Sequence, residues 1–125
     1  MSFFATGGAQ PERPGAWQDD DAAPRVPLAP GITTRPVVGA DVMLTHVHWE
    51  PGAVAPAHAH VEEQLLLVLA GAVEFTIGDD TRRMGPGDAV VIPPWVRHGG
   101  RALDAPVVTA EAFSPPRAAL LDLLG

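Results

Sequence analysis

The residue types best suited to chemistry in this chain are histidines and one glutamine that could share a metal ion. His58 and His60 stand two residues apart in a segment with an extended pattern. Side chains two residues apart on a strand point to the same side, so both imidazoles can reach one ion. Gln64 follows four residues later, and His98 ends a second segment that begins at Gly87. This spacing predicts a mononuclear metal site inside a small β-barrel.

A site built from these four donors would contribute no negative charge of its own. Three neutral imidazoles and an amide leave the full charge of a divalent ion uncompensated by protein. Such an ion is a good Lewis acid and a good anchor for carboxylates or enolates. Histidine and amide donors suit nickel, zinc, manganese, iron and cobalt alike, so we expect one divalent transition metal ion without naming it. Taken singly, each histidine is better explained as a hydrogen-bonded polar residue on a strand, and only the joint spacing favours metal binding.

Neighbouring residues offer an alternative ligand and a control. Glu62 and Glu63 lie directly before Gln64, but the spacing favours Gln64, and we expect both glutamates to face solvent in a turn. His46 and His48 repeat the two-residue spacing. The other face of their strand is more apolar and should turn inward, which would leave this second pair outward and without a metal role. That apolar face consists of Met43, Thr45, Val47 and Trp49.

A second group of candidate functional residues lies near the C-terminus. Alternation places Thr109, Glu111 and Phe113 on one face of a strand. A carboxylate that points into a barrel is costly unless a partner, metal or substrate uses it. The pattern alone also permits Glu111 to face outward on an edge strand, so both orientations remain open.

Composition excludes several kinds of chemistry. The chain has 125 residues, enough for one domain with a proper core, and no cysteine or tyrosine. Every basic residue is arginine, which rules out Schiff-base chemistry through lysine. A net charge of −7 argues against nucleic-acid or anionic-membrane partners. The chain contains no long apolar run and no signal-peptide pattern, so we expect a cytoplasmic protein.

The chain divides into an arm and one domain. Residues 1–30 are rich in Pro, Gly, Ala and Asp and are expected to form a flexible or swapped N-terminal arm, and residues 31–125 a single domain. Short extended runs separated by turn residues favour a barrel or sandwich. They predict strands at 32–38, 42–49, 54–60, 64–70, 72–77, 89–93, 96–103 and 107–113. A helix is expected over 117–124, with Ser114 as its cap.

The metal-site segments resemble the cupin superfamily, which carries two motifs. The first motif matches at Gly52, His58, His60, Gln64 and Gly71. The second matches at Gly87, Pro93 and His98, whereas Trp95 stands where a glycine is usual and Ala102 where an asparagine is usual. The resemblance implies an all-β cupin fold, a double-stranded β-helix (jelly-roll barrel) with a short C-terminal helix. It also implies a homodimer formed through the outer sheet with exchanged N-terminal arms.

A narrower resemblance covers residues 31–121. The histidine and glutamine donors, the run Glu74-Phe-Thr-Ile-Gly-Asp79 and the ending Phe113-Ser-Pro-Pro-Arg117 are similar to small cupin enzymes of pectin and alginate degradation that linearise 4,5-unsaturated uronates. This resemblance implies that a metal is held by His58, His60, Gln64 and His98. It implies a catalytic role for Glu111, Arg117 and Phe113. Glu111 stands where that family has aspartate, and its longer arm either keeps the chemistry or marks a changed substrate.

The predicted function is therefore metal-dependent ring opening, an isomerisation, of an unsaturated uronate or a related small anionic substrate. One alternative is a cupin enzyme of a biosynthetic pathway, such as a cyclase, isomerase or dioxygenase. Another is a non-catalytic cupin that binds a small molecule. An oxygenase would need iron and consume oxygen, an isomerase would do neither, and a binding protein would saturate without turnover.

Overall fold

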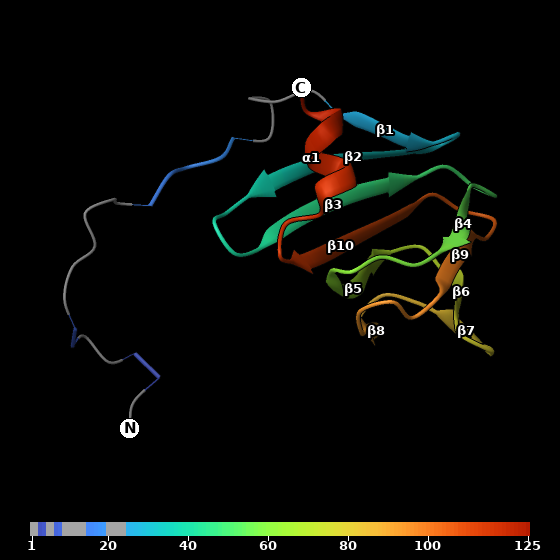
Figure 1. Cartoon of the computed structure of the whole chain (residues 1–125). Helices are drawn as coiled ribbons and strands as arrows, with labels where there is room; N and C mark the ends of the chain where they lie inside the picture. The colour runs from blue at the N-terminus through green and yellow to red at the C-terminus, as the bar shows by residue number, and fades with distance from the viewer. Residues whose placement is uncertain (1–2, 5–6, 9–14, 20–24) are drawn as a thin grey trace.

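The computed structural model describes residues 3–4, 7–8, 15–19 and 25–125, and two antiparallel sheets dominate the last of these ranges (Figure 1). The six-stranded sheet has the order β1 (Val26–Ala29), β2 (Ile32–Val38), β3 (Met43–Trp49), β10 (Val107–Ser114), β5 (Glu63–Ala70) and β8 (Ala89–Ile92). The four-stranded sheet has the order β4 (Val54–His58), β9 (His98–Ala102), β6 (Val73–Ile77) and β7 (Asp80–Met84). One helix, α1 (Ala118–Leu123), follows β10. The predicted all-β fold with a short C-terminal helix is confirmed.

The core forms because inward and outward residues alternate along the strands. Strand β5 buries Gln64, Leu66 and Val68, whereas the leucines between them are exposed. Strand β10 buries Thr109 and Glu111, and it lies between β3 and β5 in the sheet. The main apolar cluster joins the two sheets, since it contains residues of both. The candidate site residues of β5 and β10 therefore point into the space between the sheets.

All eight predicted strands are present, and two strands were missed. Strand β7 is polar and exposed apart from Met84, so it lacks the alternation that identifies a half-buried strand. Strand β1 occupies the end of the segment predicted as an arm and pairs with β2. Most of the preceding arm falls outside the described residues. Ser114 does not cap the helix, because its hydroxyl donates to the Asp41 carbonyl and the N-cap position is Arg117.

The outward orientation predicted for the second histidine pair is confirmed. His48 is exposed and His46 is half-buried on the outer side of β3. Both accept hydrogen bonds from the Arg25 guanidinium, at 3.3 Å for His46 Nδ1 and 3.1 Å for His48 Nε2. In the described part of the chain, no helix has the length and apolar character needed to span a membrane.

Candidate metal centre and active site

Three histidines from two separate segments of the chain meet beside the cavity between the sheets. His58 ends β4, His60 follows it in the loop, and His98 begins β9, where it pairs with His58 across the sheet. One ring nitrogen of each lies within 4.8 Å of the others. His60 and His98 are buried, and His58 is half-buried at the cavity. The i, i+2 spacing did place His58 and His60 together, although His60 lies just beyond the strand.

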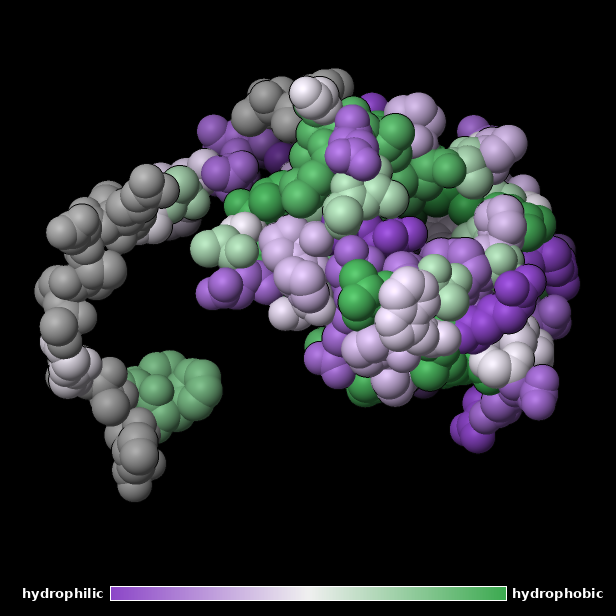
Figure 2. Space-filling view, in the orientation of Figure 1, coloured by the Kyte–Doolittle hydropathy of each residue, from purple (hydrophilic) through white to green (hydrophobic). Residues whose placement is uncertain are grey.

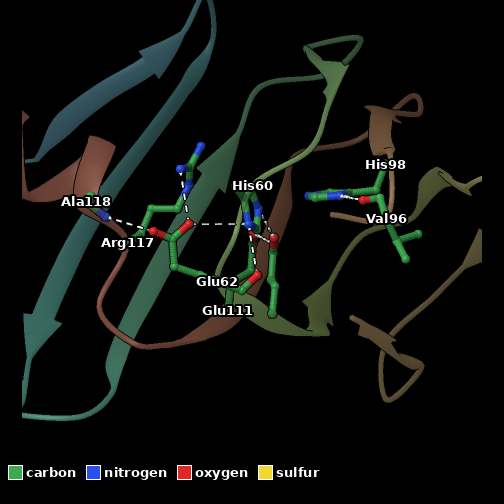
Figure 3. A network of polar contacts seen from close by, with 8 residues as sticks. His60, Glu62, Val96, His98, Glu111, Arg117 and Ala118 are labelled. Carbon is green, nitrogen blue, oxygen red and sulfur yellow. Dashed lines mark hydrogen bonds and ion pairs between the residues drawn. The ribbon is translucent and has the colours of Figure 1, made fainter. Parts of the chain in front are cut away.

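The hydrogen bonds of these rings fix which nitrogen is free. The Nδ1 atom of His58 lies 2.7 Å from the Pro56 carbonyl oxygen. That of His60 lies 3.0 Å from the Glu62 carbonyl, and that of His98 lies 2.8 Å from the Val96 carbonyl (Figure 3). A carbonyl oxygen only accepts, so each Nδ1 carries the proton. All three Nε2 atoms are therefore left with an unshared lone pair, which is the form that binds metal.

Two further observations fit a cation between these lone pairs. The Nε2 atom of His98 is buried and has no hydrogen-bond partner. The Nε2 atom of His60 lies 3.0 Å from Gln64 Oε1, although with Nδ1 protonated both atoms are acceptors. Two ligands bound at ~2.1 Å and at a right angle are ~3.0 Å apart, so the spacing suits a shared ion. The described donors thus fit a divalent metal held by three imidazoles and one amide oxygen.

Burial favours the neutral imidazoles of His60 and His98, the form that metal binding requires. Burial, with smaller contributions from the neighbouring His58, His60 and Arg117, lowers the pKa of His98 to about 4, against the opposing hydrogen bond to Val96. Burial, followed by the charge of Arg117, also lowers the pKa of His60. Protons therefore compete weakly with a metal for these two rings near neutral pH.

Glu111 faces inward and touches the amide of Gln64, so the outward alternative is wrong. Its Oε1 accepts from Gln64 Nε2 at 2.7 Å and its Oε2 from the Thr109 hydroxyl at 2.7 Å. Thr109 in turn accepts from the indole N–H of Trp49 at 3.1 Å. Because Gln64 donates through Nε2 to Glu111, its Oε1 must face the histidines. Burial raises the pKa of Glu111 to about 6, against the lowering effect of these hydrogen bonds.

The group opens onto a cavity of about 380 Å³. One wall is polar and includes His58, His98, Gln64, Glu111 and Arg117. The remaining lining is mostly apolar and comes from both sheets and from α1. Its members include Leu28, Ile32, Phe75, Leu120 and Leu123. All predicted site residues except His60 line this cavity, and His60 lies directly behind it against Gln64.

The structure corrects one expectation and explains one departure from the motif. Glu63 is exposed as expected, but Glu62 is only 2% exposed, so its predicted solvent-facing position is wrong. Sequence alternation missed it because it lies in the loop between β4 and β5. Trp95 has φ of 66°, a left-handed conformation that glycine adopts without strain. The turn before His98 thus keeps a glycine-like backbone, and Trp95 N–H donates to the His60 carbonyl at 2.8 Å.

Comparison with known proteins identifies the family. The cupin domain family matches residues 45–110, which is 66 of the 125 residues. The chain belongs to the cupin family. The predicted cupin fold is thereby confirmed.

Among cupins, the chain is similar to proteins of pectin degradation. It is 33% identical over 104 residues to the pectin degradation protein KdgF of Dickeya dadantii, covering 82% of this cupin and 94% of the relative. The solved structure of KdgF from Halomonas sp. has a TM-score of 0.79 and 30% identity, covering 86% of this cupin and 99% of that chain. Dimethylsulfoniopropionate lyase DddQ of Ruegeria pomeroyi is 38% identical over 69 residues, which cover 54% of this cupin and 34% of the lyase.

Proposed function

We propose that this cupin is a metal-dependent enzyme that opens and linearises a 4,5-unsaturated uronate or a closely related small anion. The observation that carries the proposal is the contact between Glu111 and Gln64 at the metal-binding histidines. It joins a carboxylate with a raised pKa to a candidate metal ligand inside a cavity of small-molecule size. The similarity to KdgF from two organisms supports the substrate class.

We assign His58, His60 and His98 through Nε2, and Gln64 through Oε1, as the ligands of one divalent ion. When bound, this ion supplies a positive charge that anchors the substrate's oxygens and stabilises negative charge as it develops. The protein's own part is to hold four neutral donors in place. It does so with three backbone carbonyls for the imidazoles and with Glu111 for the amide.

Two other residues position the substrate. Arg117 is partly buried. Among the described residues that line the cavity, it is the one with a cationic side chain. In a chain of net charge −7, this guanidinium provides the local attraction for a substrate carboxylate. Phe113 is buried beside His60, with ring centroids 5.8 Å apart, and offers an apolar surface for the unsaturated ring.

Glu111 would move the protons of an isomerisation. The carboxylate takes the proton of the hydroxyl on the hemiacetal carbon, the bond from that carbon to the ring oxygen breaks, and a carbonyl forms there. The electron pair of the broken bond stays on the ring oxygen, which becomes an enolate oxygen. Return of the same proton from Glu111 to the alkene carbon that does not bear this oxygen gives the linear keto form. No electron is gained or lost, so no oxidant is needed. A pKa of about 6 leaves Glu111 mostly ionised at neutral pH and still able to return a proton.

The substrate assignment is tested with 4,5-unsaturated galacturonate and metal-loaded protein. We expect the conjugated chromophore to disappear well above the spontaneous rate, with a linear keto acid as product and no oxygen consumed. Oxygen uptake would favour a dioxygenase. Saturable binding without any turnover would favour a binding cupin, and either result would remove uronate linearisation as the function.

We also propose a homodimer that forms through the outer face of the six-stranded sheet. Leu44, Leu65 and Val91 lie in adjacent strands with Ala112 between the two leucines, and all three large residues are about half exposed. Among the outward residues of β2, β3, β10, β5 and β8, all of which are described, Glu63 alone is acidic. A broad apolar face without repelling carboxylates suits a second copy of the same face.

The N-terminal arm is proposed to lie on the partner subunit. Among its described residues, Phe3, Phe4 and Trp17 are 82–97% exposed, and a second copy would cover this apolar surface. Sedimentation should give a dimer mass for the wild type and a monomer mass for Leu65→Asp, with Val54→Asp on the other sheet as control. A wild-type monomer at micromolar concentration would reject the dimer. The cytoplasmic location stays a prediction.

A further inference from the structure

Glu62 is a buried residue whose carboxylate is not among the proposed metal ligands. It lies in the loop between His60 and Gln64, yet its side chain turns toward the C-terminal helix (Figure 3). Its Oε1 lies 3.3 Å from Arg117 Nη1, and its Oε2 accepts from the Ala118 N–H at 3.2 Å. A carboxylate with 3% side-chain exposure is costly unless its partners are needed. Those partners are the first residue of α1 and the residue just before it.

Helix α1 depends on such external contacts. It has six residues, too few to be stable in isolation. The N-cap residue Arg117 makes no side-chain capping bond, and Ser114 donates elsewhere. Glu62 therefore supplies the acceptor for a first-turn N–H that a cap residue normally supplies. The other anchor is Leu120, which is buried in a small cluster with Met43 and Phe113.

The same helix forms one wall of the active-site cavity. Ala119, Leu120 and Leu123 line the cavity, and so does Arg117 just before the helix. Figure 2 shows hydrophobic residues gathered around α1, where Leu121, Leu123 and Leu124 are exposed. If α1 lifted away, the cavity would lose its apolar cover and Arg117 would lose its position. The closed cavity thus depends on how firmly the first turn is held.

Glu62 also contacts a candidate metal ligand. Its main-chain oxygen accepts the Nδ1 proton of His60 at 3.0 Å, and its Oε1 lies 3.5 Å from the same nitrogen. One residue therefore orients the His60 ring through its backbone and holds α1 and Arg117 through its side chain.

We propose that Glu62 is a positioning residue that fastens α1 over the cavity and fixes Arg117 for the substrate carboxylate. The statement about the helix stands on the contacts alone, whereas the statement about substrate rests on the proposed function. The two can fail separately. Helix closure is measurable without any substrate, and substrate affinity is measurable only if uronate is turned over.

Glu62→Gln tests the charged contact between Glu62 and Arg117 at the start of α1. The amide keeps an oxygen for the Ala118 N–H but loses the charge that attracts Arg117. In metal-loaded full-length protein, we expect amide exchange at Leu120, Leu121 and Leu124 to quicken by ~10-fold or more, with exchange in β10 unchanged. Glu63→Gln, at the exposed neighbour, is the matched control and should match wild type. Glu62→Asp, which keeps the charge, should restore part of the protection.

Kinetics separate positioning from a purely structural role. For uronate turnover, Glu62→Gln should raise KM by ~10-fold and change kcat by less than ~3-fold, because the lost contact acts on substrate binding. If Glu62→Gln fails to fold, Arg117→Met breaks the same contact from the other side and should give the same faster exchange. Wild-type exchange in α1 for both variants would overturn the proposal. Faster exchange in a protein that never turns over uronate would leave the helix contact standing and overturn the substrate assignment.

Discussion

Replacing Glu111 by glutamine should abolish most activity while leaving the fold and the metal intact. Glu111 is the carboxylate that touches Gln64, and glutamine matches its size without transferring protons. General acid–base catalysis contributes ~10²–10⁴-fold, so turnover of 4,5-unsaturated galacturonate should fall by that factor. Metal content should stay at the wild-type value, because the four proposed ligands are untouched and the oxygen of the new amide can still accept from Gln64 Nε2.

The stability change can be worked from two opposing contributions. Burial raises the Glu111 pKa from 4.5 to about 6, so ionisation in the folded state costs ~2 kcal/mol at neutral pH. Glutamine removes that cost. The two carboxylate oxygens of Glu111 accept from Gln64 Nε2 and from the Thr109 hydroxyl. Glutamine replaces one of these acceptors by an N–H donor, and the loss of that hydrogen bond costs ~1.5–3 kcal/mol of stability. The two nearly cancel, so the free energy of unfolding should change by less than ~1 kcal/mol.

The assay is chromophore loss under saturating metal, with urea unfolding and metal analysis on the same preparation. Glu74→Gln, on a side chain with 51% exposure, is the control and should be silent in all three measurements. Glu111→Asp should retain substantial activity, or raise it, if this cupin linearises uronates. Wild-type turnover by Glu111→Gln would mean that the carboxylate is structural, and the reasoning about proton transfer would be refuted.

Four further predictions concern the metal site and its supports. His58→Ala with His60→Ala should lose the metal and several orders of magnitude in activity, whereas His46→Ala and His48→Ala should retain both; unchanged metal content in the first pair would contradict the site. In metal-free protein, the free energy of unfolding should fall as pH drops from 6.5 toward about 4, because over this range the unfolded chain binds a proton on His98 and the folded chain does not. A free energy of unfolding that does not change with pH, or the same slope in His98→Ala, would contradict this. Trp95→Gly should stabilise the protein by ~0.5–1 kcal/mol in thermal unfolding, since it relieves the left-handed backbone; a lower melting temperature would show that the indole matters more. Gly71→Ala should lower the melting temperature markedly, because Gly71 has φ of 75° and an added methyl would collide with the Pro106 carbonyl oxygen; a silent change would contradict that collision.

The features that could be predicted from sequence are those that alternation and spacing encode. His58 and His60 share a side, Gln64 follows on the next strand, and Glu111 lies with Thr109 on the inward face of β10. The backbone of Trp95 also follows from the motif, because Trp95 stands where a glycine is usual and has the left-handed φ that glycine adopts there. The turn before His98 therefore has a glycine-like backbone although its residue is tryptophan.

The features that could not be predicted depend on contacts between distant segments. Strand β7 is too polar to carry an alternating signal, and β1 is identified only by its pairing with β2. The burial of Glu62 could not be predicted, because its partners, Arg117 and Ala118, lie 55 and 56 residues away. Local sequence predicts Ser114 as the helix cap, but its hydroxyl donates to the Asp41 carbonyl instead. The first N–H of the helix donates to the Glu62 carboxylate. For Glu62 and Ser114, contacts with distant segments therefore overrode the local sequence preference.

The most direct test of the central claim is to titrate chelator-treated protein with a divalent transition metal while following the loss of 4,5-unsaturated galacturonate. The account predicts a rate that rises linearly and reaches its plateau at one equivalent of metal per chain, and a His98→Ala variant that stays at the spontaneous rate throughout. A wild-type rate that is high without metal, or that never exceeds the spontaneous rate at any ratio, would contradict it.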